Sequence, residues 1–326
     1  MEAPDWVELL MRAFFCCTGI IGNSWLGLRS LPKSGSQLRT GDVLLVNLAV
    51  SNLITNCLVD LPETVAHFAK SWLTSKEYCS MTQFSHELSE TSSIFSTMFI
   101  SVYWHQKLVG SIRRGGAPVQ MDNLRLVGVL LTGSWIVSTA FSLPHVFIAE
   151  HNANESSEVC EERFASPAAK QTFDGVYLTL ANVVPMIGIT YATVQIVLTL
   201  LRSQKRIKDL SRNGANPQPS SVDQKLEAEH GIEESSPISA DASRAAAQQK
   251  TQVRSNTSNQ VRAAKSVAVA TIFIFCWFTH LVLRIYSSFR NSILAVKLTN
   301  FIGASYVCFV PYVYLHGVKK LNCSWR

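Results

Sequence analysis

The chain has 326 residues, of which 47% are hydrophobic and only 16% are charged, whereas an average soluble domain has about 25% charged residues. Its apolar residues are gathered into long uncharged blocks, and this distribution excludes an ordinary soluble domain. The formal net charge of +6 does not indicate nucleic-acid binding, because the basic residues cluster between the apolar blocks, as they do on the cytoplasmic side of membrane proteins.

Apolar segments long enough to cross a bilayer recur along the chain. Leu126–Ala149 and Val176–Leu201 contain no Asp, Glu, Lys or Arg, and each exceeds the ~20 residues that a helix needs to cross ~30 Å of hydrocarbon. A helix satisfies its own backbone hydrogen bonds in lipid. We therefore predict an all-α fold with a bundle of seven transmembrane helices, at about residues 6–28, 42–66, 79–108, 124–149, 174–202, 263–287 and 293–317.

The third predicted helix, 79–108, is the least apolar of the seven because it contains His86, Glu87 and Glu90. One interpretation is that the chain has six spans and one peripheral helix. However, ionisable residues inside a span usually face the bundle interior or a cavity and mark function. This favours seven spans, with the three side chains pointing inward.

The basic residues predict the orientation in the bilayer. The first connection carries Arg29, Lys33 and Arg39 and no acid, whereas segment 151–162 carries four glutamates. Because cytoplasmic loops are enriched in Lys and Arg, we expect the N-terminus outside and the C-terminus in the cytoplasm. We expect the helices to lie in the lipid bilayer of the plasma membrane.

The segment 204–259 does not resemble a membrane span. It contains no aromatic residue, and it is rich in Ser, Pro, Gln and Ala before it becomes acidic. Such a composition buries too little apolar area to offset the entropy of ordering. We predict a disordered third cytoplasmic loop, which either contacts a partner or is a tolerated spacer.

Cys79 and Cys160 both lie in regions predicted to face the outside, where disulfides persist. We predict that they form a disulfide, the alternative being two free thiols. Asn154 begins an Asn-Glu-Ser glycosylation sequon in the same outer loop as Cys160.

Six of the predicted helices each carry a different short motif. The motifs, in chain order, are Gly22-Asn23, Leu48-Ala49-Val50-Ser51-Asn52, Trp135 with Pro144, Pro185, Phe273 with Cys276-Trp277, and Pro311-Tyr312-Val313-Tyr314. Together they resemble the rhodopsin-like G-protein-coupled receptors, over about residues 6–320. The resemblance implies that Trp104, Trp277, Pro311 and Tyr314 belong to the parts that repack when the bundle switches state.

The chain also departs from that pattern. It reads Tyr103-Trp104-His105 where most of the class has Asp-Arg-Tyr, and Asn52 replaces the usual aspartate, so the usual ion pair and sodium site are in question. The strings Ser101–Gly110 and Asn47–Asn52 resemble the vomeronasal type 1 receptors and the fish olfactory receptor class A-related proteins. This implies a chemosensory receptor for a small-molecule chemosignal in sensory neurons, acting on a heterotrimeric G protein of the inhibitory type. A long third cytoplasmic loop is unusual for that family.

A set of polar residues at helical spacing indicates a ligand pocket between the outer halves of the helices. The alternative is purely structural: internal ion pairs, and a lysine that extends to water. Ala304 and His86 stand where opsins have the retinal lysine and aminergic receptors their aspartate, so the sequence supports neither ligand class. The predicted ligand-binding residues are Gln83, His86, Glu87, Glu90, Trp277, Arg284 and Lys297.

Three functions remain open. The first is a chemosensory receptor, the second is a receptor of the same class for an internal peptide or lipid, and the third is a transporter or channel. The chain shows no internal repeat of the kind many transporters have. It also has no HExxH, GxSxG or phosphate-loop motif, so we expect neither an enzyme, nor a cofactor, nor a metal site.

Overall fold

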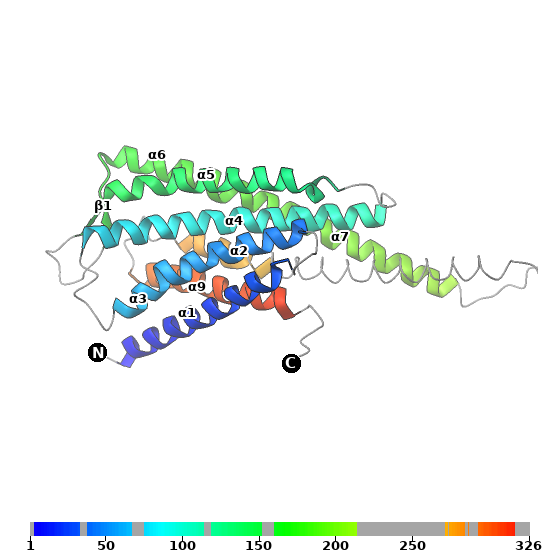
Figure 1. The fold of residues 1–326 in the computed structure, drawn as a ribbon, viewed down its shortest axis with the longest axis horizontal. Helices are drawn as coiled ribbons and strands as arrows, with labels where there is room; N and C mark the ends of the chain where they lie inside the picture. The colour runs from blue at the N-terminus through cyan, green and yellow to red at the C-terminus, as the bar shows by residue number, and fades with distance from the viewer. Residues whose placement is uncertain are drawn as a thin grey trace, which may run out of the picture.

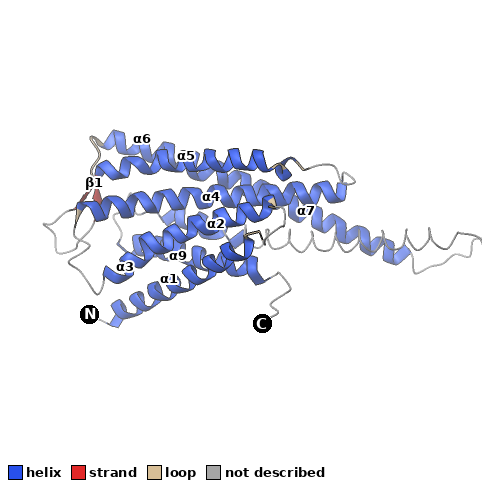
Figure 2. Ribbon diagram, in the orientation of Figure 1, coloured by secondary structure: helices blue, strands red, loops and turns tan. Residues whose placement is uncertain are grey.

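The computed structural model describes residues 3–32, 38–66, 75–113, 119–151, 160–213, 271–272, 274–283, 286 and 293–316. These residues form a bundle of long helices that run alongside one another (Figure 1). The helices account for nearly all of the drawn secondary structure, with one short pair of strands at an end of the bundle (Figure 2).

Helices lie at all seven predicted positions, which confirms the all-α class and the seven-helix bundle. The second and fifth of them each contain a π-helical stretch, called η1 and η4. The elements are α1 (Ala3–Ser30), α2 (Thr40–Thr55), η1 (Asn56–Asp60), α3 (Leu61–Ala66), α4 (Lys76–Arg113), the 3₁₀ turn η3 (Gln120–Asp122), α5 (Leu124–Ile148), α6 (Pro167–Tyr177), η4 (Leu178–Val183), α7 (Val184–Asn213), the helix Ile274–Leu283, and α9 (Ile293–His316). The strands β1 (Ala149–His151) and β2 (Cys160–Glu162) pair antiparallel.

Two helix starts follow directly from local sequence. The Asn123 side chain caps α5 by accepting hydrogen bonds from the backbone N–H groups of Arg125 and Leu126. Ser166 caps α6 by accepting one from Ala169, with Pro167 in the first turn. Both residue types satisfy N–H groups that have no partner inside the helix, and so α6 begins at Pro167, earlier than the predicted start at 174.

The surface pattern is that of a protein surrounded by lipid. Five helical segments are long and apolar enough to span a membrane, namely Trp6–Ser30, Thr40–Val65, Leu124–Ile148, Pro167–Ser203 and Lys297–Leu315. Large apolar side chains point away from the bundle, among them Phe147 and Phe275, which are 73% and 76% exposed. Serines and threonines are buried instead, as expected where lipid offers no hydrogen bond.

The helix α4 lies in the middle of the bundle and packs against α2, α5 and α7 (Figure 1). It is absent from the apolar spans, as its three ionisable residues predict. The interpretation of a peripheral helix is therefore wrong, because α4 is central and its polar side chains are buried. Ser89, Thr91, Ser92 and Ser96 are fully buried on it.

Inside the bundle, a hydrogen-bond network of neutral groups joins four helices, α1, α2, α4 and α9. The Asn52 amide donates to Asn23 Oδ1 at 3.0 Å, and Ser93 donates to Asn52 Oδ1 at 3.0 Å. Asn23 in turn donates to the Val307 carbonyl of α9. The described side chains of this network carry no charge. At the position of the usual aspartate, Asn52 supplies an amide that both donates and accepts.

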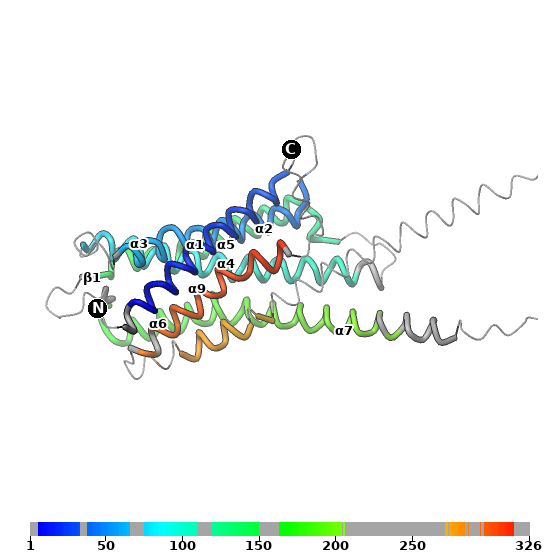
Figure 3. The backbone as a smooth tube through the Cα atoms, turned by 90° about the horizontal axis from the view of Figure 1, so that it is seen from below, coloured from blue at the N-terminus to red at the C-terminus, as the bar shows by residue number. Residues whose placement is uncertain are grey.

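The helix α7 ends at Asn213 and extends past the other helices (Figure 3). It therefore continues into the segment 204–259 that we predicted to be disordered. Adding residues to an existing helix costs little once the membrane-spanning part has formed it. The part of that segment beyond Asn213 lies outside the described residues.

Replacing Asn52 by Leu should destabilise the receptor, because it leaves the buried Asn23 Oδ1 and Ser93 Oγ atoms without their partner. An unsatisfied buried polar group costs about 1–3 kcal/mol, so we expect a lower unfolding temperature in detergent. The matched control is Val50→Leu on the exposed side of the same helix, which should change little. Equal unfolding temperatures for the two variants would contradict the network's role.

Candidate functional site

A cavity of about 390 Å³ lies within the half of the bundle that contains the N-terminus. It is bounded by α1, the η1–α3 segment, α4, the helix Ile274–Leu283 and α9. The first half of α1 and of α9 run side by side along it (Figures 1 and 3). Pockets for small molecules are typically about 300–1,000 Å³, so the volume is enough for a small ligand.

One edge of the cavity is an ion-pair network that joins three helices. Arg12 of α1 donates to Glu8 one turn away at 3.1 Å and to Glu63 of α3 at 2.9 Å. Lys297 of α9 contacts the other oxygen of Glu8 at 2.8 Å. These side chains are partly exposed, so each pair contributes only about 0–1 kcal/mol. Their main effect is to hold α1 against α3 and α9.

The α4 wall carries part of the predicted polar stripe. His86 and Glu90 line the cavity one helical turn apart, with His86 Nδ1 at 3.4 Å from Glu90 Oε2. Glu87 is 3% exposed but does not line the cavity. It follows His86 directly, and consecutive side chains on a helix point about 100° apart around its axis. Gln83 does not line it either, and its part in ligand binding stays a prediction.

The deep end of the cavity is aromatic. Trp277 lines it and donates from Nε1 to Asn182 Oδ1 at 3.0 Å. The His280 ring stacks on Trp277 with centroids 4.7 Å apart and 18° between the planes. Tyr306 of α9 also lines it, and its hydroxyl lies 3.0 Å from Thr97 Oγ1 on α4. Trp277 Nε1 and the Tyr306 hydroxyl thus each have a partner on another helix.

Apolar side chains of α1 and α9 form an apolar wall of the cavity. Phe15 and Phe301 meet edge to face there, with ring centroids 5.1 Å apart. The apolar residues of this wall are Val7, Met11, Phe15, Leu294, Leu298 and Phe301. The cavity therefore offers both charged and apolar contacts.

Asp60 also lines the cavity, from the last position of η1. Its Oδ2 atom is buried and accepts no hydrogen bond from any described residue. Asp60, Glu8 and Arg12 are not among the predicted site residues. A charged residue inside a predicted span was the available signal for Asp60, but a π-helical turn shifts which side chains face inward, and the sequence pattern does not reveal it.

The other predicted site residues divide between described and undescribed parts of the chain. Arg284 and Asn154 lie outside the described residues. Cys79 is buried and disulfide-bonded, and β1, whose His151 pairs in register with Cys160, packs on α4. The Cys160 side chain lies outside the described part, so the Cys79–Cys160 pairing stays a prediction.

The predicted switch residues occupy different depths of the bundle. Trp277 closes the cavity, whereas Trp104, Pro311 and Tyr314 belong to the opposite half and pack on or beside the hydrophobic core. Pro311 approaches α1 so closely that a Cβ atom on Gly22 would lie 2.9 Å from its ring, which explains the glycine. Their role as switches stays a prediction.

Where the class usually has Asp-Arg-Tyr, α4 uses other contacts. Lys107 Nζ donates to Asp122 Oδ1 at 2.9 Å and to the Tyr103 hydroxyl at 3.1 Å. The backbone N–H of Met121 donates to Gln106 Oε1 at 3.1 Å. These bonds hold η3 against α4 and bury Met121, which is 3% exposed.

Comparison with known proteins identifies the family. The model of the "7 transmembrane receptor (rhodopsin family)" matches residues 32–318. Similar curated proteins include the neuropeptide Y receptor type 6 of Mus musculus, 26% identical over 61% of this chain and 54% of its own length. The C-C chemokine receptor type 7 of Mus musculus is 24% identical over 61% and 52%, and the alpha-1A adrenergic receptor of Oryzias latipes is 25% identical over 97% and 65%. The chain thus spans about half the length of the first two.

The Cys160→Ser variant should reach the cell surface poorly, because a disulfide that closes a long loop contributes typically about 2–4 kcal/mol. Surface labelling of intact cells measures this. Cys17→Ser is the control, since Cys17 is free and exposed. Normal surface levels and an unchanged unfolding temperature for Cys160→Ser would contradict the predicted Cys79–Cys160 bond.

Proposed function

The chain belongs to the rhodopsin family of seven-transmembrane receptors, and we propose that it is a chemosensory member that couples a small-molecule ligand to a heterotrimeric G protein. The observation that carries this proposal is the cavity of about 390 Å³ whose deep end is formed by Trp277 and Tyr306. A ligand there would contact α1, α4 and α9 at once, and so would bias their relative positions. The family is one of receptors and not of enzymes.

The positive-inside rule supports an outward-facing cavity. The basic residues near Arg29 and Arg39 lie at the far end of α1 and the start of α2, which supports an N-terminus and a cavity that face the outside. The protein is a multi-pass membrane protein, and the plasma membrane of a sensory neuron is the location we propose. The ligand-binding residues that we propose are His86, Glu90, Trp277 and Lys297 on the cavity wall, together with Arg284, Gln83 and Glu87.

The chemosensory assignment, and coupling to an inhibitory-type G protein, rest on the resemblance of the strings Ser101–Gly110 and Asn47–Asn52 to vomeronasal type 1 and related fish receptors. The alternative is a receptor for an internal peptide or lipid, which the names of the similar neuropeptide, chemokine and cysteinyl leukotriene receptors favour. A cavity within the helices favours a small molecule over a folded peptide. Expression confined to sensory epithelium would separate the two proposals.

The direct experiment is a signalling assay in cells that express the full chain, against a panel of small odorants. An inhibitory-type response is read as a fall in stimulated cyclic AMP. We expect at least one odorant to act through the cavity. A response to a peptide panel alone would contradict the chemosensory proposal and support the alternative.

The Gly303→Phe variant should abolish the ligand response, because it fills the cavity. Gly303 lines the cavity, and a Cβ atom placed on it would meet nothing within 4 Å, so the bulky ring enters open space and does not strain the backbone. Gly128→Phe is the matched control, since a Cβ there also meets nothing within 4 Å and Gly128 does not line the cavity. A normal response in Gly303→Phe at normal surface levels would place the ligand elsewhere.

A further inference from the structure

We infer that the ligand of this cavity is an amphiphilic amine whose protonated nitrogen binds the carboxylate of Asp60, and not a residue at the position of the aminergic aspartate, where this chain has His86. The inference rests on the proposed function, since it names the chemical class of the ligand for the same cavity. It depends on three features of the described residues: where η1 places Asp60, how the other charges around the cavity are paired, and where the apolar wall lies.

The first feature is the position of Asp60 at the end of the π-helical turn Asn56–Asp60. Such turns are rare in proteins as a whole, but many of those that occur lie at functional sites. They add a residue to one helical turn and so redirect the side chains that follow. Asp60 Oδ2 is buried and accepts no hydrogen bond from the described residues. Burying a carboxylate without a partner is costly, so a ligand that donates a charged hydrogen bond would bind favourably.

The second feature is the pairing of the other described carboxylates of the cavity. Glu8 is bonded to Arg12 and Lys297, Glu63 to Arg12, and Glu90 contacts His86. Glu63, His86 and Arg12 act electrostatically on Asp60, and Arg12 already bridges two glutamates.

Charge counting among the described lining residues therefore favours a cationic ligand. The lining has four carboxylates, on Glu8, Asp60, Glu63 and Glu90, against the permanent cations Arg12 and Lys297 and the imidazole of His86. When all four carboxylates are ionised, negative charge remains in excess even when His86 is protonated. A cation in the cavity would offset that excess, whereas an anionic ligand would have to displace Glu8 or Glu63 from the two permanent cations.

The third feature is the apolar wall of α1 and α9. Met11, Phe15, Leu298 and Phe301 lie on it, and the same cavity has an acidic wall with Asp60 of η1 and Glu90 of α4. Burial of apolar surface contributes roughly 25 cal/mol per Å², so the wall would bind the hydrocarbon part of a ligand while the amine contacts Asp60. An aryl- or alkylamine matches both walls, and a small hydrophilic cation matches only one.

The test uses the full chain, purified in lipid nanodiscs, and three matched sets of probes. The three sets differ in their hydrocarbon body, which is phenethyl, indolylethyl or octyl. Within a set, the three probes share that body and end in an amine, a hydroxyl or a carboxylate. Affinity is read from the concentration dependence of the unfolding temperature, since a ligand that binds the folded state stabilises it. We expect the amine to bind more tightly than its matched alcohol and acid in at least one set.

The variant Asp60→Asn should bind that amine at least about tenfold more weakly, because a hydrogen bond to a charged group contributes about 1.5–3 kcal/mol. Without ligand its unfolding temperature should be unchanged or higher, since the variant removes a buried charge. Asp60→Glu keeps the charge and should retain more affinity for the amine than Asp60→Asn. The control Asp174→Asn, an exposed acid of α6 that does not line the cavity, should bind the amine normally.

Several results would overturn the inference. The first two are tighter binding of the acids or alcohols than of the amines, and failure of all three sets to bind. The third is an amine affinity in Asp60→Asn equal to that of the unchanged protein. The fourth is loss of folding in Asp60→Asn but not in Asp174→Asn, which would make Asp60 structural. Tighter binding of an acid or alcohol that Gly303→Phe abolishes overturns the amine class and leaves the proposed function standing. Amine binding that persists in Gly303→Phe would instead remove the cavity as the site, and with it both proposals.

Discussion

Polar groups that face the interior of this bundle need partners on other helices, because neither lipid nor a hydrocarbon core offers a hydrogen bond. The helix α4 meets this constraint most fully, since it lacks a long apolar segment and lies between α2, α5 and α7. Ser93 binds Asn52, Ser96 accepts from Asn47, and Thr97 lies beside Tyr306. These contacts fix the rotation of α4, and that rotation places His86 and Glu90 on the cavity wall.

The same constraint explains how the bundle manages without two ionic features common in its class. At the level of Asn52, an amide network replaces a carboxylate, and each amide both donates and accepts. At the other end of α4, Lys107 and Gln106 bind Asp122 and Met121 of η3. A hydrogen bond from a charged lysine is stronger than one between neutral groups, so this pair holds the connection between α4 and α5 where a G protein of our proposed type would approach.

The helix positions were predictable from the sequence because each requires only a run of apolar residues of sufficient length. The central place of α4 was also predictable, since charges on a span such as Glu90 must turn away from lipid. Side-chain partners were harder to predict. Lys297 was expected either to bind ligand or to extend to water, and its contact with Glu8, nearly the whole chain away, was not predicted. Asp60 required knowledge of the π-helical turn η1, and no residue in Asn56–Asp60 indicates that turn.

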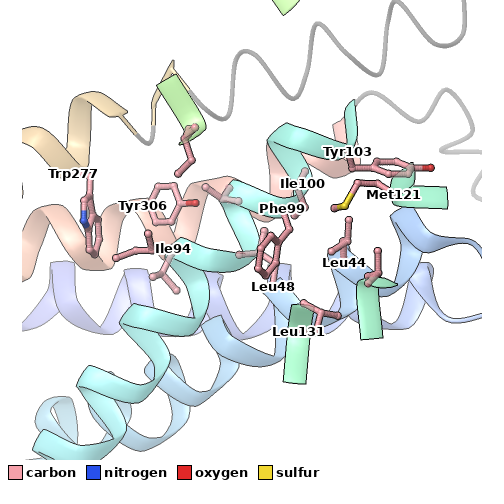
Figure 4. Packing of buried hydrophobic residues seen from close by; sticks show 14 residues of the cluster. Leu44, Leu48, Ile94, Phe99, Ile100, Tyr103, Met121, Leu131, Trp277 and Tyr306 are labelled. Atoms are coloured by element: carbon pink, nitrogen blue, oxygen red, sulfur yellow. The ribbon is translucent and has the colours of Figure 1, made fainter. Parts of the chain in front are cut away.

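The hydrophobic core provides a physical route from the cavity to the opposite end of the bundle. Its buried side chains run from Trp277 and Tyr306 past Ile94, Phe99 and Leu48 to Tyr103 and Met121 (Figure 4). Protein interiors are close-packed, so a displaced side chain requires its neighbours to move. A ligand that moves Trp277 would change its bond to Asn182 and its stacking on His280, and so would couple α7 and the helix Ile274–Leu283 to this core. Because Tyr103 also contacts Lys107, which binds Asp122, the far end of the same core is joined to η3. Occupancy of the cavity and the position of η3 are thus linked through one continuous set of packed residues.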